Sequence, residues 1–270
     1  MNWRSDALLP VPSSATGRTR LLSANWKMNH NHLEAIATVE RLYRVLRPEQ
    51  FRYAELSIHP PFVDLRSLQL LFESDRMPFV LGAQNCHQEE GGAFTGEVSA
   101  PMLAKLGVGY VIVGHSERRR LYGESVELVA AKAAAVVRSG MTPIVCVGET
   151  LQERESDATA AVIVAQLEAV VASIPADSLS KLVVAYEPVW AIGSGQPASP
   201  EDAAKAASII RETVFIRGGD RAANQVRVQY GGSVNAMNAS AFMAAPGIDG
   251  LLVGTASLDP EGYAQLIKDA

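Results

Sequence analysis

The chain alternates eight times between a short run rich in β-branched residues and a longer stretch in which Ala and Leu recur at helical spacing. This pattern is typical of parallel strands joined by helical crossovers. Eight such units in roughly 250 residues match the usual size of a closed barrel. The pattern therefore predicts an α/β fold, a closed (β/α)8 barrel in a single domain. The predicted strands span 21–27, 55–60, 79–85, 109–115, 142–148, 181–188, 226–232 and 250–257.

Two of the helical stretches carry end signals that agree with this division. "VELVAAKAAAVVRSG" ends at Gly140, and "SPEDAAKAASIIRETVF" begins with the capping residue Ser199 followed by Pro200. An open, doubly wound sheet is the competing arrangement, and it normally shows a glycine-rich phosphate turn after the first strand. The segment "SANWKMNHN" at 23–31 contains no such turn. The closed barrel is therefore favoured.

The first 19 residues lie ahead of this pattern, and we predict that they form a disordered extension to a barrel domain spanning 20–270. Prolines, hydroxyl residues and an acid interrupt the apolar run that a signal peptide needs. An Arg- and Ser-rich organelle transit sequence is the alternative for this extension.

The net charge argues against some classes of binding partner, and the cysteines indicate the compartment. The net charge of −5 gives no global attraction to nucleic acid or to an anionic membrane. Cys86 and Cys146 have neither metal-binding nor disulfide-framework spacing, which indicates buried thiols in a reducing compartment. No apolar stretch reaches the length of a membrane helix. We therefore expect a cytoplasmic protein that binds neither nucleic acid nor membranes.

Polar side chains stand where the predicted strands end, which is where a closed parallel barrel gathers its active groups. The first strand ends at Lys27, a cation that can face an anionic substrate, and Asn25 lies on the same face two residues earlier. The fourth strand ends at His115, where the start of the next helix favours the neutral ring. The alternatives are an exposed surface lysine and a structural histidine at a turn.

The sixth strand ends at Glu187, beside aromatic residues and a proline. Loss of hydration raises the pKa of a carboxyl group toward the range of a general base. The alternative is a buried salt bridge from Glu187 to Arg119 or Lys27. The segment "PVWAIGSG" at 188–195 follows, with an apolar tip between a proline and two glycines, as is typical of a mobile lid.

The last two strands end in "YGGSV" and "VGTAS", which consist mostly of small residues. Backbone amides beside small residues can approach a phosphate group closely. The loops after the seventh and eighth strands are also the usual phosphate position in such barrels. The sequence therefore predicts a substrate that carries a phosphate.

Together these motifs resemble the triosephosphate isomerase family. The segments "NWKMN", "GAQN", "GGAFTGE", "GHSERR", "AYEPVWAIG" and "YGGSV" occur in that family's chain order, and the resemblance covers residues 20–270. It implies a TIM barrel that interconverts glycerone phosphate and D-glyceraldehyde 3-phosphate by proton transfer through an enediolate.

The resemblance also implies roles for individual residues. Glu187 would be the base that moves a proton between C1 and C2, and neutral His115 would polarise the carbonyl group. Lys27 would stabilise negative charge, with Asn25 as a further polar contact. The backbone amides that would bind the phosphate belong to Gly193, Ser233, Gly254 and Thr255.

The implied assembly is a homodimer, or a higher assembly of dimers. The loop that carries Thr95 would reach the partner subunit's site near Asn25 and Lys27. The resemblance implies no metal and no organic cofactor, because side chains alone can transfer a proton next to a carbonyl group.

Thr255 departs from the family pattern, which usually shows a glycine there. A β-branched residue restricts the backbone and adds bulk beside the phosphate, so a positive φ at Thr255 would count against the site. Two other functions stay open: an isomerase of a four-carbon ketose phosphate, and a sugar-phosphate-binding paralogue without turnover. Retention of Asn25, Lys27, His115 and Glu187 argues against the paralogue, because a pure binder has no need of a base.

Overall fold

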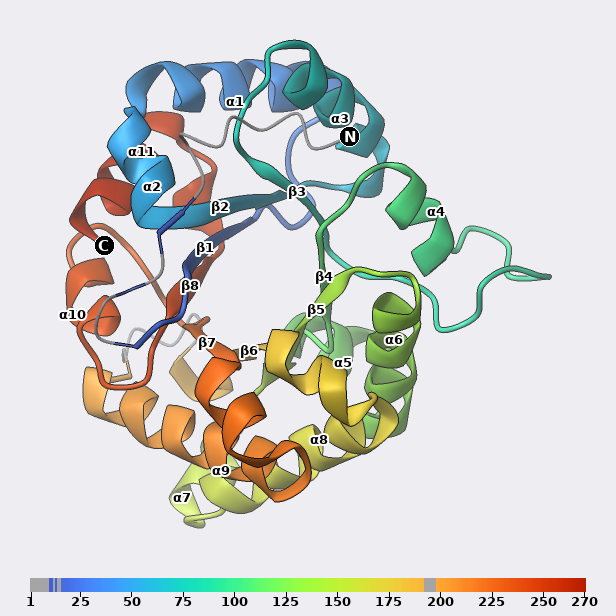
Figure 1. The fold of residues 1–270 in the computed structure, drawn as a ribbon, viewed down its shortest axis with the longest axis vertical. Helices are drawn as coiled ribbons and strands as arrows, with labels where there is room; N and C mark the ends of the chain where they lie inside the picture. Colours follow the sequence, from blue (N-terminus) through green and yellow to red (C-terminus); the bar gives the residue numbers. More distant parts are fainter. Residues whose placement is uncertain (1–9, 12, 14–15, 192–197) are drawn as a thin grey trace.

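The computed structural model describes residues 10–11, 13, 16–191 and 198–270. Within these residues, eight parallel strands close into a barrel in chain order, and β1 pairs with both β2 and β8 (Figure 1). The predicted single-domain α/β fold with a closed (β/α)8 barrel is confirmed. The strands are β1 (Arg20–Asn25), β2 (Ala54–His59), β3 (Val80–Ala83), β4 (Tyr110–Val113), β5 (Thr142–Val147), β6 (Val183–Tyr186), β7 (Arg227–Tyr230) and β8 (Gly250–Val253).

The α-helices form a ring outside the strands (Figure 1). They are α1 (His32–Val45), α2 (Pro48–Tyr53), α3 (Leu65–Ser74), α4 (Ala100–Lys105), α5 (Ser116–Tyr122), α6 (Val126–Arg138), α7 (Leu151–Glu155), α8 (Thr159–Ser173), α9 (Pro200–Gln225), α10 (Ala239–Met243) and α11 (Pro260–Asp269). Short 3-10 helices are η2 (Phe62–Asp64), η3 (Ala176–Lys181), η4 (Val189–Ala191) and η5 (Thr255–Ser257).

The apolar core consists of two layers on either side of the strands. The larger layer lies between the strands and the helices and includes Trp26, Phe72 and Phe242. The smaller layer fills the barrel interior with residues that include Ile112 and Ile144. Successive side chains of a strand point to opposite faces, so each strand can contribute to both layers.

The predicted strands are confirmed, but all eight end earlier than the apolar pattern suggested. The largest difference is in the last one, predicted to reach residue 257, where β8 ends at Val253 and η5 begins at Thr255. The Ser257 hydroxyl donates to the carbonyls of Gly254, at 2.7 Å, and Val253, at 3.2 Å, which closes this turn. At the other end of a strand, Lys181 belongs to η3 rather than to β6. The small residues at 254–257 suit both a strand and a tight turn, so the sequence pattern could not show where β8 ends.

The predicted helix ends are confirmed where capping residues marked them. Ser199 caps α9 through a reciprocal pair of hydrogen bonds with Asp202, and Pro200 is the first helical residue. Gly140 follows the end of α6 with a φ of 78°, a backbone conformation that favours glycine.

Part of the N-terminal extension lies against the barrel. Arg18 Nε forms an ion pair with Asp249 Oδ1 at 2.7 Å, and Arg18 also donates to the Asn224 carbonyl at 3.0 Å. The amide of Val11 donates to the Arg52 carbonyl at 2.9 Å. Residues 1–9, 12 and 14–15 lie outside the described part of the chain, so the division into 1–19 and 20–270 stays a prediction. None of the described helices has the length and apolar character that crossing a membrane requires.

Candidate active site

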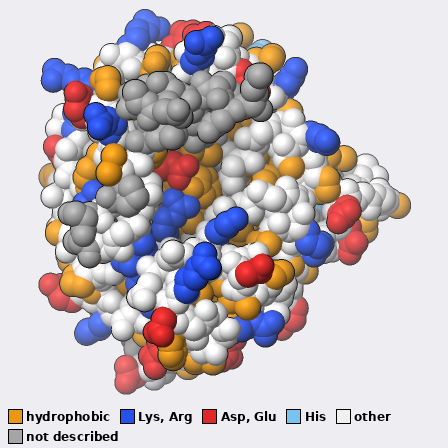
Figure 2. Space-filling view, viewed as in Figure 1, with side chains coloured by type: hydrophobic (Ala, Val, Ile, Leu, Met, Phe, Trp, Pro, Cys, Tyr) orange, Lys and Arg blue, Asp and Glu red, His pale blue; other side chains and the backbone are white. Residues whose placement is uncertain are grey.

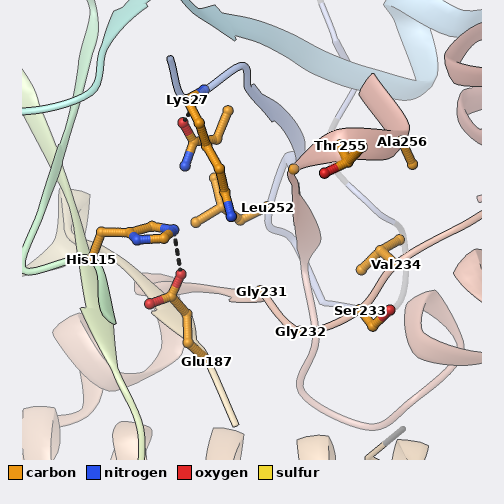
Figure 3. A pocket seen from close by; sticks show the side chains of 12 residues that line it. Lys27, His115, Glu187, Gly231, Gly232, Ser233, Val234, Leu252, Thr255 and Ala256 are labelled. Atoms are coloured by element: carbon orange, nitrogen blue, oxygen red, sulfur yellow. Dashed lines mark hydrogen bonds and ion pairs between the residues drawn. The ribbon is translucent and has the colours of Figure 1, made fainter. Parts of the chain in front are cut away.

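A cavity of about 320 Å³ lies at the carboxyl ends of the strands, where the polar side chains were expected. All of the predicted site residues that the structure describes line it: Asn25, Lys27, His115, Glu187, Ser233, Gly254 and Thr255. Gly193 and the middle of the expected lid, residues 192–197, lie outside the described residues. Figure 3 shows Lys27, His115 and Glu187 on one side of this cavity and Ser233 and Thr255 on the other.

Glu187 lies directly after β6 and contacts His115, which follows β4. Its Oε1 is 3.0 Å from His115 Nε2, and its Oε2 accepts a hydrogen bond from the Ser116 amide at 2.8 Å (Figure 3). The residue is only 2% exposed. Gly231 leaves room for this carboxylate, because a Cβ atom at that position would lie 3.0 Å from Glu187 Cγ. The acid is therefore held at the edge of the cavity by a ring and an amide from the neighbouring β4–α5 junction.

The pKa of Glu187 differs from the expectation based on burial alone. Burial by itself raises the pKa of this carboxyl group, but the His115 ring and the Ser116 amide together outweigh burial, and the pKa is lowered. The prediction of a raised pKa is therefore wrong for this arrangement of side chains. The sequence placed the acid correctly but could not show which donors would face it.

His115 Nδ1 accepts a hydrogen bond from the Glu117 amide at 3.2 Å. An amide N–H can only donate here, so Nδ1 carries no proton and the single ring proton lies on Nε2, toward Glu187. Burial lowers the pKa of His115, but the adjacent carboxylate of Glu187 outweighs burial, so the pKa is raised. The start of α5 thus fixes the tautomer of His115, whereas the predicted shift toward the neutral ring is wrong, because the pKa of His115 is raised.

Lys27 reaches the cavity from a strained backbone. Its φ is 53°, in the left-handed region that non-glycine residues seldom occupy. Its ammonium group forms an ion pair with Glu117 Oε1 at 2.7 Å. The Gln84 side-chain amide donates to the Lys27 carbonyl at 2.7 Å and to the His59 carbonyl at 2.9 Å, which holds this backbone in place.

Sequence reasoning missed Glu117 and Gln84 as parts of the site. Both lie in motifs quoted above, Glu117 in "GHSERR" and Gln84 in "GAQN". Those motifs are the signal from which a place in the site could have been predicted for them. The alternative salt bridge from Glu187 to Lys27 or Arg119 is absent among the described residues. The Arg119 guanidinium donates instead to the carbonyls of Gly114, at 2.9 Å, and Cys146, at 3.3 Å.

The far end of the cavity is formed by the loops after β7 and β8, with Ser233, Gly254 and Thr255. Thr255 is not among the described non-glycine residues with positive φ, so its backbone is compatible with a β-branched side chain. Lys27 extends toward this end, since its Nζ lies 3.9 Å from the position that a Cβ atom on Gly254 would take. A cation and small residues therefore face the same space.

A second cavity, of about 590 Å³, adjoins the first and shares Asn25, Lys27 and His115 with it. Several of the apolar side chains that line this second cavity are largely exposed: Met28 is 94% exposed, Leu121 62% and Tyr122 68%. The loop with exposed Thr95 belongs to the segment between β3 and α4, and it projects from the body of the molecule (Figures 1 and 2). In the described part of the chain, no three His, Cys, Asp or Glu side chains are grouped so that they could hold a metal ion.

Comparison with known proteins gives one consistent result. The family model described as Triosephosphate isomerase matches residues 20–270. A protein named Triosephosphate isomerase from Corynebacterium diphtheriae is 48% identical over 253 residues, which cover 94% of this chain and 97% of that protein. A protein of the same name from Streptomyces coelicolor is 45% identical over 94% of this chain and 98% of that protein. Another, from Mycobacterium bovis, is 46% identical over 92% of this chain and 95% of that protein.

Proposed function

The chain belongs to the triosephosphate isomerase family, and from this membership we propose that it interconverts glycerone phosphate and D-glyceraldehyde 3-phosphate. It is an intramolecular aldose–ketose isomerase that takes a proton from one carbon of a triose phosphate and returns it to the next. The observation that carries this proposal is the contact of 3.0 Å between buried Glu187 and His115 in the cavity that also contains Lys27.

Glu187 is proposed as the base. Its carboxylate removes a proton from C1 of glycerone phosphate, and the electron pair of that C–H bond forms the C1–C2 double bond of the enediolate. The same carboxyl group then returns a proton to C2, which gives D-glyceraldehyde 3-phosphate. No atom is gained or lost in the overall reaction.

His115 is proposed as the group that serves the two oxygens of the enediolate. Its Nε2 carries the single ring proton, so the neutral ring can donate to the carbonyl oxygen while negative charge develops there. After transfer, Nε2 accepts the hydroxyl proton from the neighbouring oxygen. Lys27 adds a positive charge on the same side of the cavity, and Asn25 supplies a further polar contact.

Substrate binding also changes the basicity of Glu187 in this scheme. When a sugar lies between the acid and His115, the ring that lowers the pKa of Glu187 is replaced by the sugar. Burial, which is the largest single influence and acts to raise this pKa, then has less to oppose it. The carboxylate thus becomes a stronger base when its substrate is present.

The phosphate group is proposed to lie against the backbone amides of Ser233, Gly254 and Thr255, with Gly193 as the expected fourth donor. Ser233 and Thr255 lie at the end of the cavity away from His115 in Figure 3, and Gly254, which precedes Thr255, lines the same cavity. Proton transfer between C1 and C2 takes place at one end of the cavity and the phosphate group binds at the other. This separation orients the three-carbon substrate.

The assembly is proposed to be a homodimer in the cytoplasm. The Thr95 loop would enter the second cavity of the partner subunit, beside Lys27, and cover the exposed apolar side chains there. Buried thiols at Cys86 and Cys146 suit a reducing compartment.

A coupled isomerase assay with three- and four-carbon ketose phosphates tests the proposed reaction. We expect turnover of the three-carbon pair, with kcat/KM on the order of 10- to 100-fold above that of the four-carbon substrate, because one extra carbon must fit the same cavity. The relatives, all named for the three-carbon reaction, give no support to the four-carbon or the silent alternative. Equal or faster turnover of the four-carbon substrate, or phosphate binding without any turnover, would contradict the proposal.

A further inference from the structure

Thr255 places a side-chain hydroxyl at the end of the cavity where the phosphate is proposed to bind. It lies two residues beyond β8, lines the cavity and is exposed to it. Its side chain extends from η5 toward the cavity in Figure 3. A glycine at this position would offer a backbone amide alone, whereas threonine adds a second donor on the same residue.

The Thr255 hydroxyl takes no part in closing its own turn. In the described residues it makes no hydrogen bond, whereas the hydroxyl of Ser257, two residues later, donates to the carbonyls of Gly254 and Val253. These two hydroxyls belong to the same short turn, and only that of Ser257 closes it. With respect to residues 16–191 and 198–270, the Thr255 hydroxyl is therefore available to bind a ligand.

The surroundings of Thr255 favour an anionic ligand. The Lys27 ammonium group lies 3.9 Å from the position that a Cβ on Gly254, the preceding residue, would take. Ser233 lines the same end of the cavity from the β7 loop. Hydrogen bonds from a hydroxyl to a charged oxygen are stronger than those to a neutral one, so a phosphate oxygen is the acceptor that fits this position.

We propose that Thr255 is a further substrate contact, whose hydroxyl donates a hydrogen bond to the phosphate group and increases the affinity of the site for phosphate monoesters. This inference rests on the proposed function for the identity of the substrate. The binding chemistry itself needs only an oxyanion at this end of the cavity. The hydroxyl group of Thr255 therefore strengthens phosphate binding, and the bulk of the side chain does not obstruct it.

Three substitutions at position 255 separate the hydroxyl from the bulk of the side chain. Thr255→Val keeps the shape and removes the donor, Thr255→Ser keeps the donor and removes the methyl group, and Thr255→Gly removes both. Thr159→Val is the matched control, because it makes the same chemical change on the first turn of α8, away from the cavity.

The probe is inorganic phosphate, whose dissociation constant is measured by titration calorimetry and, where turnover exists, as a competitive inhibition constant. We expect Thr255→Val and Thr255→Gly to weaken phosphate binding about tenfold and to raise KM for D-glyceraldehyde 3-phosphate similarly, with a smaller change in kcat. Thr255→Ser and Thr159→Val should stay within about twofold of the unsubstituted protein.

The inference is overturned if Thr255→Val binds phosphate as well as the unsubstituted protein does, or if Thr255→Gly binds it more tightly. It is also overturned if Thr255→Ser loses as much affinity as Thr255→Val, since the methyl group would then be the important part. Failure of the proposed function looks different: the unsubstituted protein would bind phosphate but isomerise no triose phosphate, and the calorimetric comparison at position 255 would still decide the hydroxyl's role.

Discussion

At the scale of single residues, Glu187 and His115 control each other's proton affinity through one contact of 3.0 Å. The pKa of the acid is lowered and that of the ring is raised, although burial alone acts in the opposite direction on each. The Ser116 and Glu117 amides hold these two side chains in register from the start of α5. The geometry of the reacting groups therefore depends on side-chain length as well as on charge.

Shortening the acid tests that geometry. Glu187→Asp withdraws the carboxylate by about one methylene group, so we expect kcat to fall by on the order of 10²-fold or more, with a modest change in KM. Steady-state kinetics in both directions measure this. An unchanged kcat would remove Glu187 from the role of base.

A second histidine, His59, is buried in the barrel wall beside Asn25 and takes no part in the proposed chemistry. Its Nδ1 lies 3.1 Å from the Ala83 carbonyl, which can only accept, so that nitrogen carries the proton. Its Nε2 then accepts from the Ser57 hydroxyl at 3.0 Å, and Ser57 is in turn hydrogen-bonded to Ser23 at 2.8 Å. The ring is therefore neutral and fully satisfied in the folded protein.

Acid should destabilise the fold through His59. Burial lowers its pKa to about 4, with the Ala83 carbonyl acting in the opposite direction, whereas the unfolded chain has the ordinary value of 6.5. Between these values only the unfolded chain binds the proton, so stability present above pH 6.5 is lost as the pH falls toward 4, by about 3 kcal/mol in total.

Urea unfolding at pH 7, 5.5 and 4 measures this contribution. His59→Gln removes the titrating group, so the stability difference between pH 7 and pH 4 should shrink by about 3 kcal/mol relative to the unsubstituted protein. His32→Gln, which removes an exposed histidine, serves as the control. Parallel pH profiles for His59→Gln and the unsubstituted protein would contradict this account.

At the scale of elements, Asp249 connects three parts of the chain just before β8. Its carboxylate pairs with Arg211 of α9 and with Arg18 of the N-terminal segment, each at 2.7 Å, and accepts from the Val228 amide of β7 at 2.9 Å. Asp249 is 4% exposed, so its charge is compensated almost entirely by these donors. The N-terminal segment is thereby tied to the last two strands.

Removing one of these donors should cost stability without unfolding the protein. Arg18→Ala leaves Asp249 with Arg211 and the Val228 amide, so we expect a loss of about 1–3 kcal/mol in the free energy of unfolding. The control is Arg41→Ala, which breaks an exposed ion pair with Glu261 and should change stability by less than about 1 kcal/mol. Equal effects of the two substitutions in urea unfolding would refute the importance of burial at Asp249.

At the scale of the whole molecule, exposed apolar side chains surround the second cavity beside Lys27. Met28, Leu121 and Tyr122 are each more than half exposed. Exposed apolar surface of this kind is typical of interaction sites. The loop with Thr95, between β3 and α4, projects from the body of its own subunit (Figure 1). A dimer would cover both features at once.

A charge at this surface should separate the subunits. We expect Met28→Glu to shift the protein from dimer toward monomer in sedimentation velocity at micromolar concentration, and to lower kcat/KM at least about tenfold, because a buried charge opposes association. Ile216→Glu changes a residue that is 74% exposed on α9 and should alter neither property. The proposed assembly would be contradicted if the unsubstituted protein were a fully active monomer, or if Met28→Glu remained a dimer.

The order of the elements and the chemistry at the strand ends could be predicted from the sequence. Alternating apolar runs and capping residues such as Ser199 are local signals. They depend only on residues that are close together in the sequence, so they can be recognised without the folded structure. The boundaries of the strands could not be predicted in the same way, because the residues after Val253 suit both a strand and the turn that η5 forms.

The sequence by itself determined that Glu187, His115 and Lys27 would meet, since parallel strands in a closed barrel end on one face. Only the tertiary structure decided what each of them contacts: Lys27 pairs with Glu117, 90 positions away, and Glu187 accepts from the Ser116 amide, 71 positions away. A pKa depends on burial and on the nearest donors and charges in space. Spacing along the chain does not record those distances, so the direction of the shifts at Glu187 and His115 had to come from the folded molecule.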